Sequence, residues 1–162
     1  MIVCLTRILG YVVAMLLFQQ AAAFTYPEYG ITFQNGSQSD DFGAAVAVSQ
    51  DYVIVGSTTA RELYVFDVSG TLLRRISVQE EGEWAHGNVI LGNSVAVFAD
   101  MILAGSENND VAYVFSASTG ALQRQLIPDA TLLQSHYGES VAICGENNIG
   151  VVSSPYLSTP NA

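Results

Sequence analysis

The chain has 162 residues, of which 50% are hydrophobic and only 12% are charged, so a folded core is expected and a disordered chain is excluded. Five arginines and no lysine stand against fifteen carboxylates, which gives a formal net charge of −10 at pH 7. This balance argues against nucleic acid and anionic membrane surfaces as partners, because no basic stripe is available to neutralise phosphates.

The N-terminus predicts a secretory signal peptide at residues 1–23. Arg7 precedes an apolar run of eleven residues, Ile8–Phe18, and three alanines end the segment at Ala23. A basic start, a short apolar core and an Ala-x-Ala site are the parts of such a signal, so we expect cleavage after Ala23 and a secreted protein without a membrane segment. An uncleaved anchor that begins at Ile2 is the alternative.

The sequence has two cysteines, Cys4 and Cys144. Because Cys4 lies in the predicted signal peptide, Cys144 is the only thiol of the expected mature chain, which excludes an internal disulfide. We expect Cys144 to be a small residue on a strand. A reactive or intermolecular thiol is the alternative.

Residues 24–40 form an N-terminal segment ahead of the repeated part of the chain. A short extended stretch in it, Ile31–Phe33, is a candidate for the outer strand that closes a ring of blades. The polar run that follows contains the glycosylation sequon Asn35-Gly36-Ser37 in a predicted exposed turn. Asn35 is therefore a candidate glycosylation site if the source is a eukaryote.

Residues 41–162 contain three copies of one sequence pattern. Gly43–Ser57 and Gly92–Ser106 are near-copies that begin 49 residues apart, and a third copy begins 46 residues further on, at Gly138. A period of this size is typical of repeat folds in which each repeat is one supersecondary unit. We assign the repeats to residues 41–77, 89–127 and, in part, 137–157.

Each complete copy contains four short runs rich in β-branched and aromatic residues, separated by turn residues. The expected strands of the first copy are Ala45–Ser49, Tyr52–Gly56, Leu63–Val68 and Thr71–Ser77. Those of the second are Ser94–Phe98, Met101–Gly105, Val111–Phe115 and Ala121–Leu126. The third copy supplies two, Ser140–Ile143 and Gly150–Ser154.

The strand pattern predicts an all-β protein built from β-propeller blades. The first and second strands of each copy are apolar on successive residues, which indicates burial on both faces, whereas the fourth strands carry arginines as an outer edge does. Four-stranded antiparallel sheets with this repeat length are typical of propellers, and a flat β-solenoid is the alternative. We expect about two and a half blades, an incomplete propeller, because closed rings contain typically four to eight.

Short motifs recur in register across the three copies. Phe42-Gly43 is followed by Val46-Ala47 and by Val53–Ser57, while Tyr64–Phe66 has a twin in Tyr113–Phe115. These motifs resemble the FG-GAP repeat of integrin-α-type β-propellers over residues 41 to about 157. The resemblance implies a propeller fold and a role in cell adhesion or extracellular recognition. The chain departs from the family pattern where Phe-Gly becomes Leu91-Gly92 and Tyr137-Gly138.

Many members of this family carry a calcium loop between the first two strands of a repeat. Such a loop needs several oxygen ligands, typically over about nine residues or more. The corresponding connections are only Gln50-Asp51 and Ala99-Asp100, and Gly145–Asn148 in the third copy has a single carboxylate. The chain therefore resembles the metal-free branch of the family, and we expect neither a metal nor a cofactor.

Two loops carry the remaining candidate site residues. Glu107–Asp110 is the most oxygen-rich loop, and Glu107, Asn109 and Asp110 are its candidate cation ligands, with a solvated turn as the alternative. The connection between the first two repeats holds the only tryptophan, Trp84, together with His86. These two are candidates for a ligand-binding loop, with packing of Trp84 beneath the loop as the alternative.

The sequence contains no catalytic motif of the H-E-x-x-H, C-x-x-C or G-x-S-x-G type, so we assign no catalytic residue. We expect a secreted, non-enzymatic β-propeller repeat module for extracellular recognition or adhesion, with a protein or a glycan as its partner. A propeller fragment of a larger secreted enzyme and a structural cell-surface repeat protein are the alternatives. The chain is expected either to belong to a longer product or to self-associate, because open blades expose strand edges.

Overall fold

The computed structural model of the chain describes residues 40–78, 89–129, 135–145 and 149–156. The chain divides into two units between Thr32 and Phe33, and all described residues belong to the second unit. The predicted signal peptide and the predicted strand Ile31–Phe33 lie outside the described residues. Within these ranges, no helix has the length and apolarity that crossing a membrane requires.

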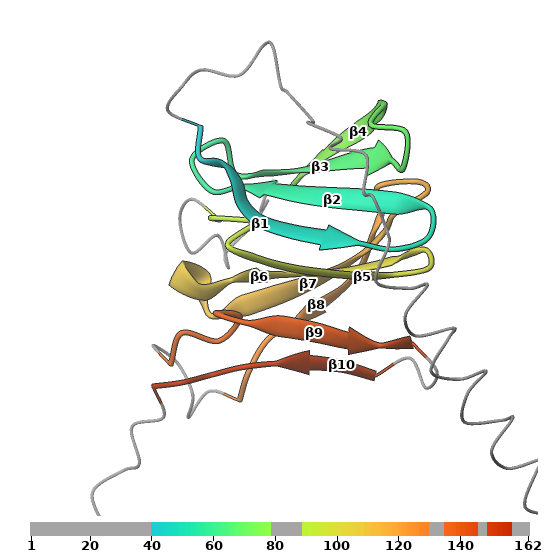
Figure 1. The fold of residues 1–162 in the computed structure, drawn as a ribbon. Coiled ribbons are helices and arrows are strands. Elements are labelled where there is room, and N and C mark those ends of the chain that lie inside the picture. The colour runs from blue at the N-terminus through green and yellow to red at the C-terminus, as the bar shows by residue number, and fades with distance from the viewer. Residues whose placement is uncertain (1–39, 79–88, 130–134, 146–148, 157–162) are drawn as a thin grey trace, which may run out of the picture. The chain divides into compact units, whose positions relative to one another are not determined.

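The described residues form three antiparallel sheets (Figure 1). Sheet A contains β1 (Phe42–Val48), β2 (Tyr52–Ser57), β3 (Glu62–Asp67) and β4 (Leu72–Ser77), in that order. Sheet B contains β5 (Ser94–Phe98), β6 (Met101–Ser106), β7 (Val111–Ser116) and β8 (Leu122–Leu126), with a 3-10 turn, η1 (Glu107–Asn109), before β7. Sheet C contains β9 (Val141–Cys144) and β10 (Ile149–Val152). These sheets confirm the predicted all-β fold of four-stranded blades.

Side chains fix the tight turns that set the strand register. The backbone N–H of Ser49 donates to the carbonyl of Tyr52 at 2.8 Å, which closes the two-residue connection between β1 and β2. The hydroxyl of Ser49 accepts the backbone N–H of Tyr52 at 3.1 Å and so supports a turn that lacks the favoured glycine. Between β3 and β4, the carboxylate of Asp67 accepts the backbone N–H groups of Ser69 and Thr71 at 2.9 and 2.8 Å, an Asx turn.

The core lies between sheets A and B. Alternation along the strands brings Ile54 and Val65 to the face of sheet A that packs against Ile102, Tyr113 and Phe115 of sheet B, and all five side chains are buried. Strand β5 lies against β1 and β2, and β9 in turn lies against β5 and β6, so the three sheets follow one another in chain order (Figure 1).

The prediction that the first two strands of every copy are buried on both faces is only partly correct. It is confirmed for the central strands β2 and β6, which are largely buried. It is wrong for β1, where Val46 and Val48 are 67% and 71% exposed, and for sheet C, where Ile149 and Val151 are 49% and 58% exposed. These residues lie on the two outer sheets, and no further sheet among the described residues covers them.

Pairs of glycines set the separation between neighbouring sheets. A Cβ atom at Gly56 would lie 2.1 Å from the carbonyl oxygen of Gly92, and one at Gly105 would lie 1.9 Å from that of Gly138. Gly92 and Gly138 also have φ angles of +97° and +98°, which favour glycine. The last glycine of the second strand of one repeat therefore receives the first glycine of the next repeat. The recurrence of the motif reflects this packing.

The first and third copies differ from this scheme at one position each. Gly43 has the same left-handed φ of +95°, but no described atom lies within 4 Å of its Cβ position. In sheet C, Ser153 takes the position of Gly56 and Gly105, because it pairs with Ser140 as Gly105 pairs with Ser94. Its backbone N–H donates to the Ser140 carbonyl at 2.8 Å, and its hydroxyl accepts the Ser140 N–H at 2.9 Å.

Candidate functional site

The starts of the first strands and the connections between the second and third strands lie at the same end of their sheets, because each sheet is an antiparallel meander. We call this end the loop edge. It contains residues 40–41, 58–61, 89–93, 107–110 and 135–139. The opposite end carries the β1–β2 and β5–β6 hairpins and the β3–β4 and β7–β8 turns. All three of the predicted cation ligands lie on the loop edge.

A polar groove opens on the loop edge at the junction of sheets A and B, with a volume of about 450 Å³. Seven polar residues line it: Asp41, Thr58, Thr59, Arg61, Asn93, Glu107 and Asn108. Asp41 accepts hydrogen bonds from the hydroxyls of Thr59 at 2.7 Å and Thr58 at 3.3 Å, so its carboxylate is held by the turn that follows β2. Hydroxyls, amides, two carboxylates and a cation in one concave surface suit a polar ligand.

Two of the predicted cation ligands are structural links. The side-chain oxygen of Asn109 accepts the Ser106 hydroxyl at 2.9 Å and the backbone N–H of Ile90 at 3.2 Å. The carboxylate of Asp110 accepts the backbone N–H of Tyr137 at 3.0 Å. Asn109 therefore ties η1 to the start of the second repeat, and Asp110 ties it to the start of the third. The sequence signal for this role is an Asn-Asp pair directly before a strand. In the structure, Asp110 has a φ of 52°, in the left-handed region that Asn and Asp tolerate.

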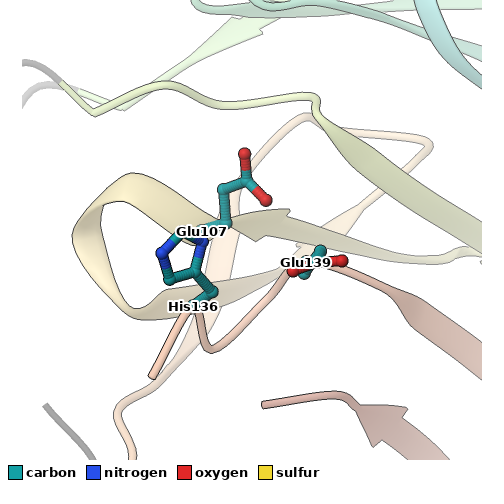
Figure 2. A group of neighbouring side chains, drawn as sticks. All are labelled: Glu107, His136 and Glu139. Atoms are coloured by element: carbon teal, nitrogen blue, oxygen red, sulfur yellow. The ribbon is translucent and has the colours of Figure 1, made fainter. Parts of the chain in front are cut away.

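The third predicted ligand, Glu107, lies in a cluster of metal-ligating side chains. Figure 2 shows Glu107 on η1, with His136 and Glu139 on the segment that leads into β9. One ligand atom from each of the three lies within 4.8 Å of the other two. Glu107 is half-buried, and the other two residues are exposed. We did not predict His136 or Glu139 as ligands; they lie about 30 residues beyond Glu107 and approach it because Gly138 packs on Gly105.

The backbone and a ring contact fix the position of His136. Its φ is 57°, in the left-handed region, and its carbonyl accepts the backbone N–H of Glu139 at 3.1 Å, so the two residues share one turn. The imidazole ring packs on Tyr156, with ring centroids 4.6 Å apart. Next to it, burial raises the pKa of the Tyr137 phenol above its ordinary value of 10.0. His136 and Glu139 are thus presented together toward η1.

At the opposite end, two carboxylates organise turns. A hydrogen bond from the Ser69 hydroxyl, at 2.6 Å, is the main cause of a lowered pKa for Asp67, and the backbone N–H of Thr71 adds to it. Desolvation acts to raise the pKa of Asp100, but hydrogen bonds from Ser118 and Ser116 outweigh it, so the net shift is downward from 3.8. Both carboxylates therefore stabilise turns of the fold.

Trp84, His86 and Asn35 lie outside the described residues. Cys144 is exposed at the end of β9, on a strand as predicted.

Comparison with known protein families identifies the repeat. Residues 29–66 match the family model of the FG-GAP repeat, which includes β1 to β3 nearly to its end. The first repeat of the chain is therefore similar to an FG-GAP repeat. This match confirms the predicted resemblance for the first copy. The comparison with curated proteins finds no match.

The comparison with solved structures finds one with a similar fold. Hydrazine synthase of Kuenenia stuttgartiensis aligns with a TM-score of 0.52 and 11% identity, over 75% of this chain and 32% of that one. Sqt1 of Saccharomyces cerevisiae aligns with a TM-score of 0.44 and 13% identity, over 59% of this chain and 23% of that one. The chain thus spans about a third of hydrazine synthase, and at this identity the likeness concerns the propeller fold alone.

Proposed function

We propose that the chain is a secreted, non-enzymatic β-propeller repeat module that recognises an extracellular protein or glycan through its loop edge. The FG-GAP match and the blade sheets support the repeat module. The apolar run Ile8–Phe18 with the alanines before Phe24 supports secretion.

The polar groove at the junction of sheets A and B carries the proposal. The contact of Gly56 with Gly92 brings the turn after β2 next to the start of the following repeat, so the groove is lined by two repeats. Loops on a rigid scaffold are the usual place for recognition. Arg61 offers a planar cation that suits carboxylate or sulfate groups, while the hydroxyls and amides around it suit sugar hydroxyls and peptide groups.

The experiment begins with secretion of the protein from a host cell through its own N-terminus, where we expect Phe24 as the first residue. The purified protein is then screened against an array of glycans and extracellular proteins. The probe that binds best is titrated with Arg61→Asn, in which asparagine tolerates the φ of 60° at this position. We expect Arg61→Asn to weaken binding at least about tenfold.

The matched control is Asp51→Asn, which changes an exposed charge at the opposite end of sheet A. It should leave binding unchanged. Retention of the protein inside the host cell would contradict secretion. The absence of any bound probe, or equal weakening by both substitutions, would contradict recognition through the groove.

A further inference from the structure

We propose that Glu107, His136 and Glu139 form a binding site for a zinc-type transition-metal dication that bridges sheets B and C. The site does not depend on the recognition function proposed above. It lies on the loop edge, whereas the calcium loops that many members of the family carry would lie at the β1–β2 and β5–β6 hairpins, at the opposite end.

The separations of the three ligand atoms suit a single ion. Even if all three pairs were at the 4.8 Å limit, an ion at their centre would be about 2.8 Å from each. Zinc binds imidazole nitrogen and carboxylate oxygen at about 2.0 to 2.2 Å, so each side chain needs to move by roughly 0.6 to 0.8 Å. Rotation of the side chains supplies a shift of that size, because none of the three is buried: His136 and Glu139 are exposed and Glu107 is half-buried.

The three side chains also differ from their neighbours in their hydrogen bonds. Asn109 and Asp110, on the same loop as Glu107, accept hydrogen bonds from the start of the second and third repeats. In contrast, no other side chain in the described ranges hydrogen-bonds or ion-pairs with the side chain of Glu107, His136 or Glu139. Three donor groups from two repeats thus converge with their donor atoms available to an ion.

The equivalent positions of the preceding junction show that the repeat fold does not require this cluster. Sequence register places Thr58 at the position of Glu107, Ile90 at that of His136 and Asn93 at that of Glu139. These three residues likewise come together at the junction of sheets A and B, where they line the polar groove. A hydroxyl, an alkyl group and an amide pack there without a metal-ligating set. The same backbone therefore carries ligands at one junction only.

The chemistry of the donors favours zinc over calcium. Imidazole nitrogen is a good ligand for zinc and for neighbouring transition metals, and two carboxylates with water complete a tetrahedral or five-coordinate site. Calcium takes six to eight oxygen ligands, and two glutamates supply too few. Because Glu107 belongs to sheet B and the other two ligands precede β9, a bound ion would stabilise the junction at the Gly105–Gly138 contact.

The test is a titration of the metal-free protein with zinc chloride against a competing colorimetric chelator, with the thermal midpoint Tm measured in parallel. We expect one zinc ion per chain, a rise in Tm with zinc and no comparable rise with calcium. His136→Asn, which keeps a residue that tolerates the left-handed φ, and Glu139→Gln should each weaken zinc binding about tenfold or more. Circular dichroism checks that both variants keep the β fold.

Two controls decide between this site and others. His86→Asn removes the only other histidine and should leave zinc binding unchanged, as should Asp51→Asn at the opposite end. The proposal is overturned if the wild type shows no saturable zinc binding, or if binding survives both His136→Asn and Glu139→Gln.

Amide hydrogen exchange distinguishes a zinc ion that bridges sheets B and C from one that is bound only by the turn before β9. We expect zinc to slow amide exchange both in η1 and in residues 135–141, including the Tyr137 N–H that donates to Asp110. Glu107→Gln should remove the slowing in η1. Slowing confined to residues 135–139 would overturn the bridge.

Discussion

The substitution Gly105→Ala tests the glycine contact that joins sheets B and C. A Cβ atom at this position would lie 1.9 Å from the carbonyl oxygen of Gly138 and 2.3 Å from the hydroxyl of Ser94. The first obstacle is backbone, which has no rotamer that avoids the clash. The second is the hydroxyl that donates to the same Gly138 carbonyl at 2.7 Å. Alanine therefore forces the sheets apart and disturbs the hydrogen bond that joins them.

The expected cost follows from this geometry. Contacts of a real Cβ are essentially never shorter than 3.0 Å, so the Gly138 backbone must withdraw by about 1 Å. Overpacking of this kind costs about 1 to 3 kcal/mol, against a gain of about 0.4 to 1 kcal/mol from the restricted unfolded chain. Because the obstacle is backbone and a buried hydrogen bond is lost as well, we expect a net loss of about 2 kcal/mol. In a chain of this size Tm should fall by about 4 to 8 °C.

Urea unfolding followed by circular dichroism measures the loss, with Gly150→Ala as the matched control. A Cβ at Gly150 would meet only the end of the Leu103 side chain, at 3.2 Å, which can move. We expect this variant to stay within about 1 kcal/mol of the wild type. If Gly105→Ala is no less stable than Gly150→Ala, the glycine contact does not set the spacing of the sheets, and packing between repeats does not explain why the motif recurs.

Two further variants, one single and one double, test the hydrogen bonds of the fold. Ser94→Ala removes the buried donor to the Gly138 carbonyl and should lower the free energy of unfolding by about 1 to 2 kcal/mol in urea titrations; an unchanged midpoint would contradict the bond. The pKa values of Asp67 and Asp100 are lowered in the folded state, so their contribution to stability is complete above the ordinary value of 3.8 and is lost as the pH falls through the folded pKa. Wild type should therefore lose stability below about pH 4 more steeply than the double variant Asp67→Asn/Asp100→Asn, and equal pH profiles of Tm would refute this.

The blade fold could be predicted from the sequence because its signals are local. Runs such as Tyr52–Gly56 and Met101–Gly105 are apolar throughout, and the structure places them as the central strands β2 and β6. The two-residue connection Gln50-Asp51 indicated the hairpin register even without a favoured turn pair, since Ser49 supplies the missing support. Both inferences need only residues a few positions apart.

Exposure and the ligand cluster could not be predicted in the same way. Val46 has the same apolar neighbours in sequence whether or not a sheet covers it, so its exposure depends on an arrangement that local pattern does not encode. Glu107 and His136 are separated by a whole inter-repeat connection, and only the stacking of sheets B and C brings them together. Placing the copies in register and asking which loop positions share a junction would have found the pair.

The glycine contacts give the row of repeats a direction, and Ser153 interrupts the glycine pattern in sheet C. Each junction is heterologous: the first glycine of one repeat enters against a bare backbone position of the repeat before it. Gly43 has the left-handed φ of the entering glycines, while sheet C has Ser153 at the receiving position. A glycine that approached sheet C as Gly138 approaches Gly105 would therefore meet a side chain in place of bare backbone.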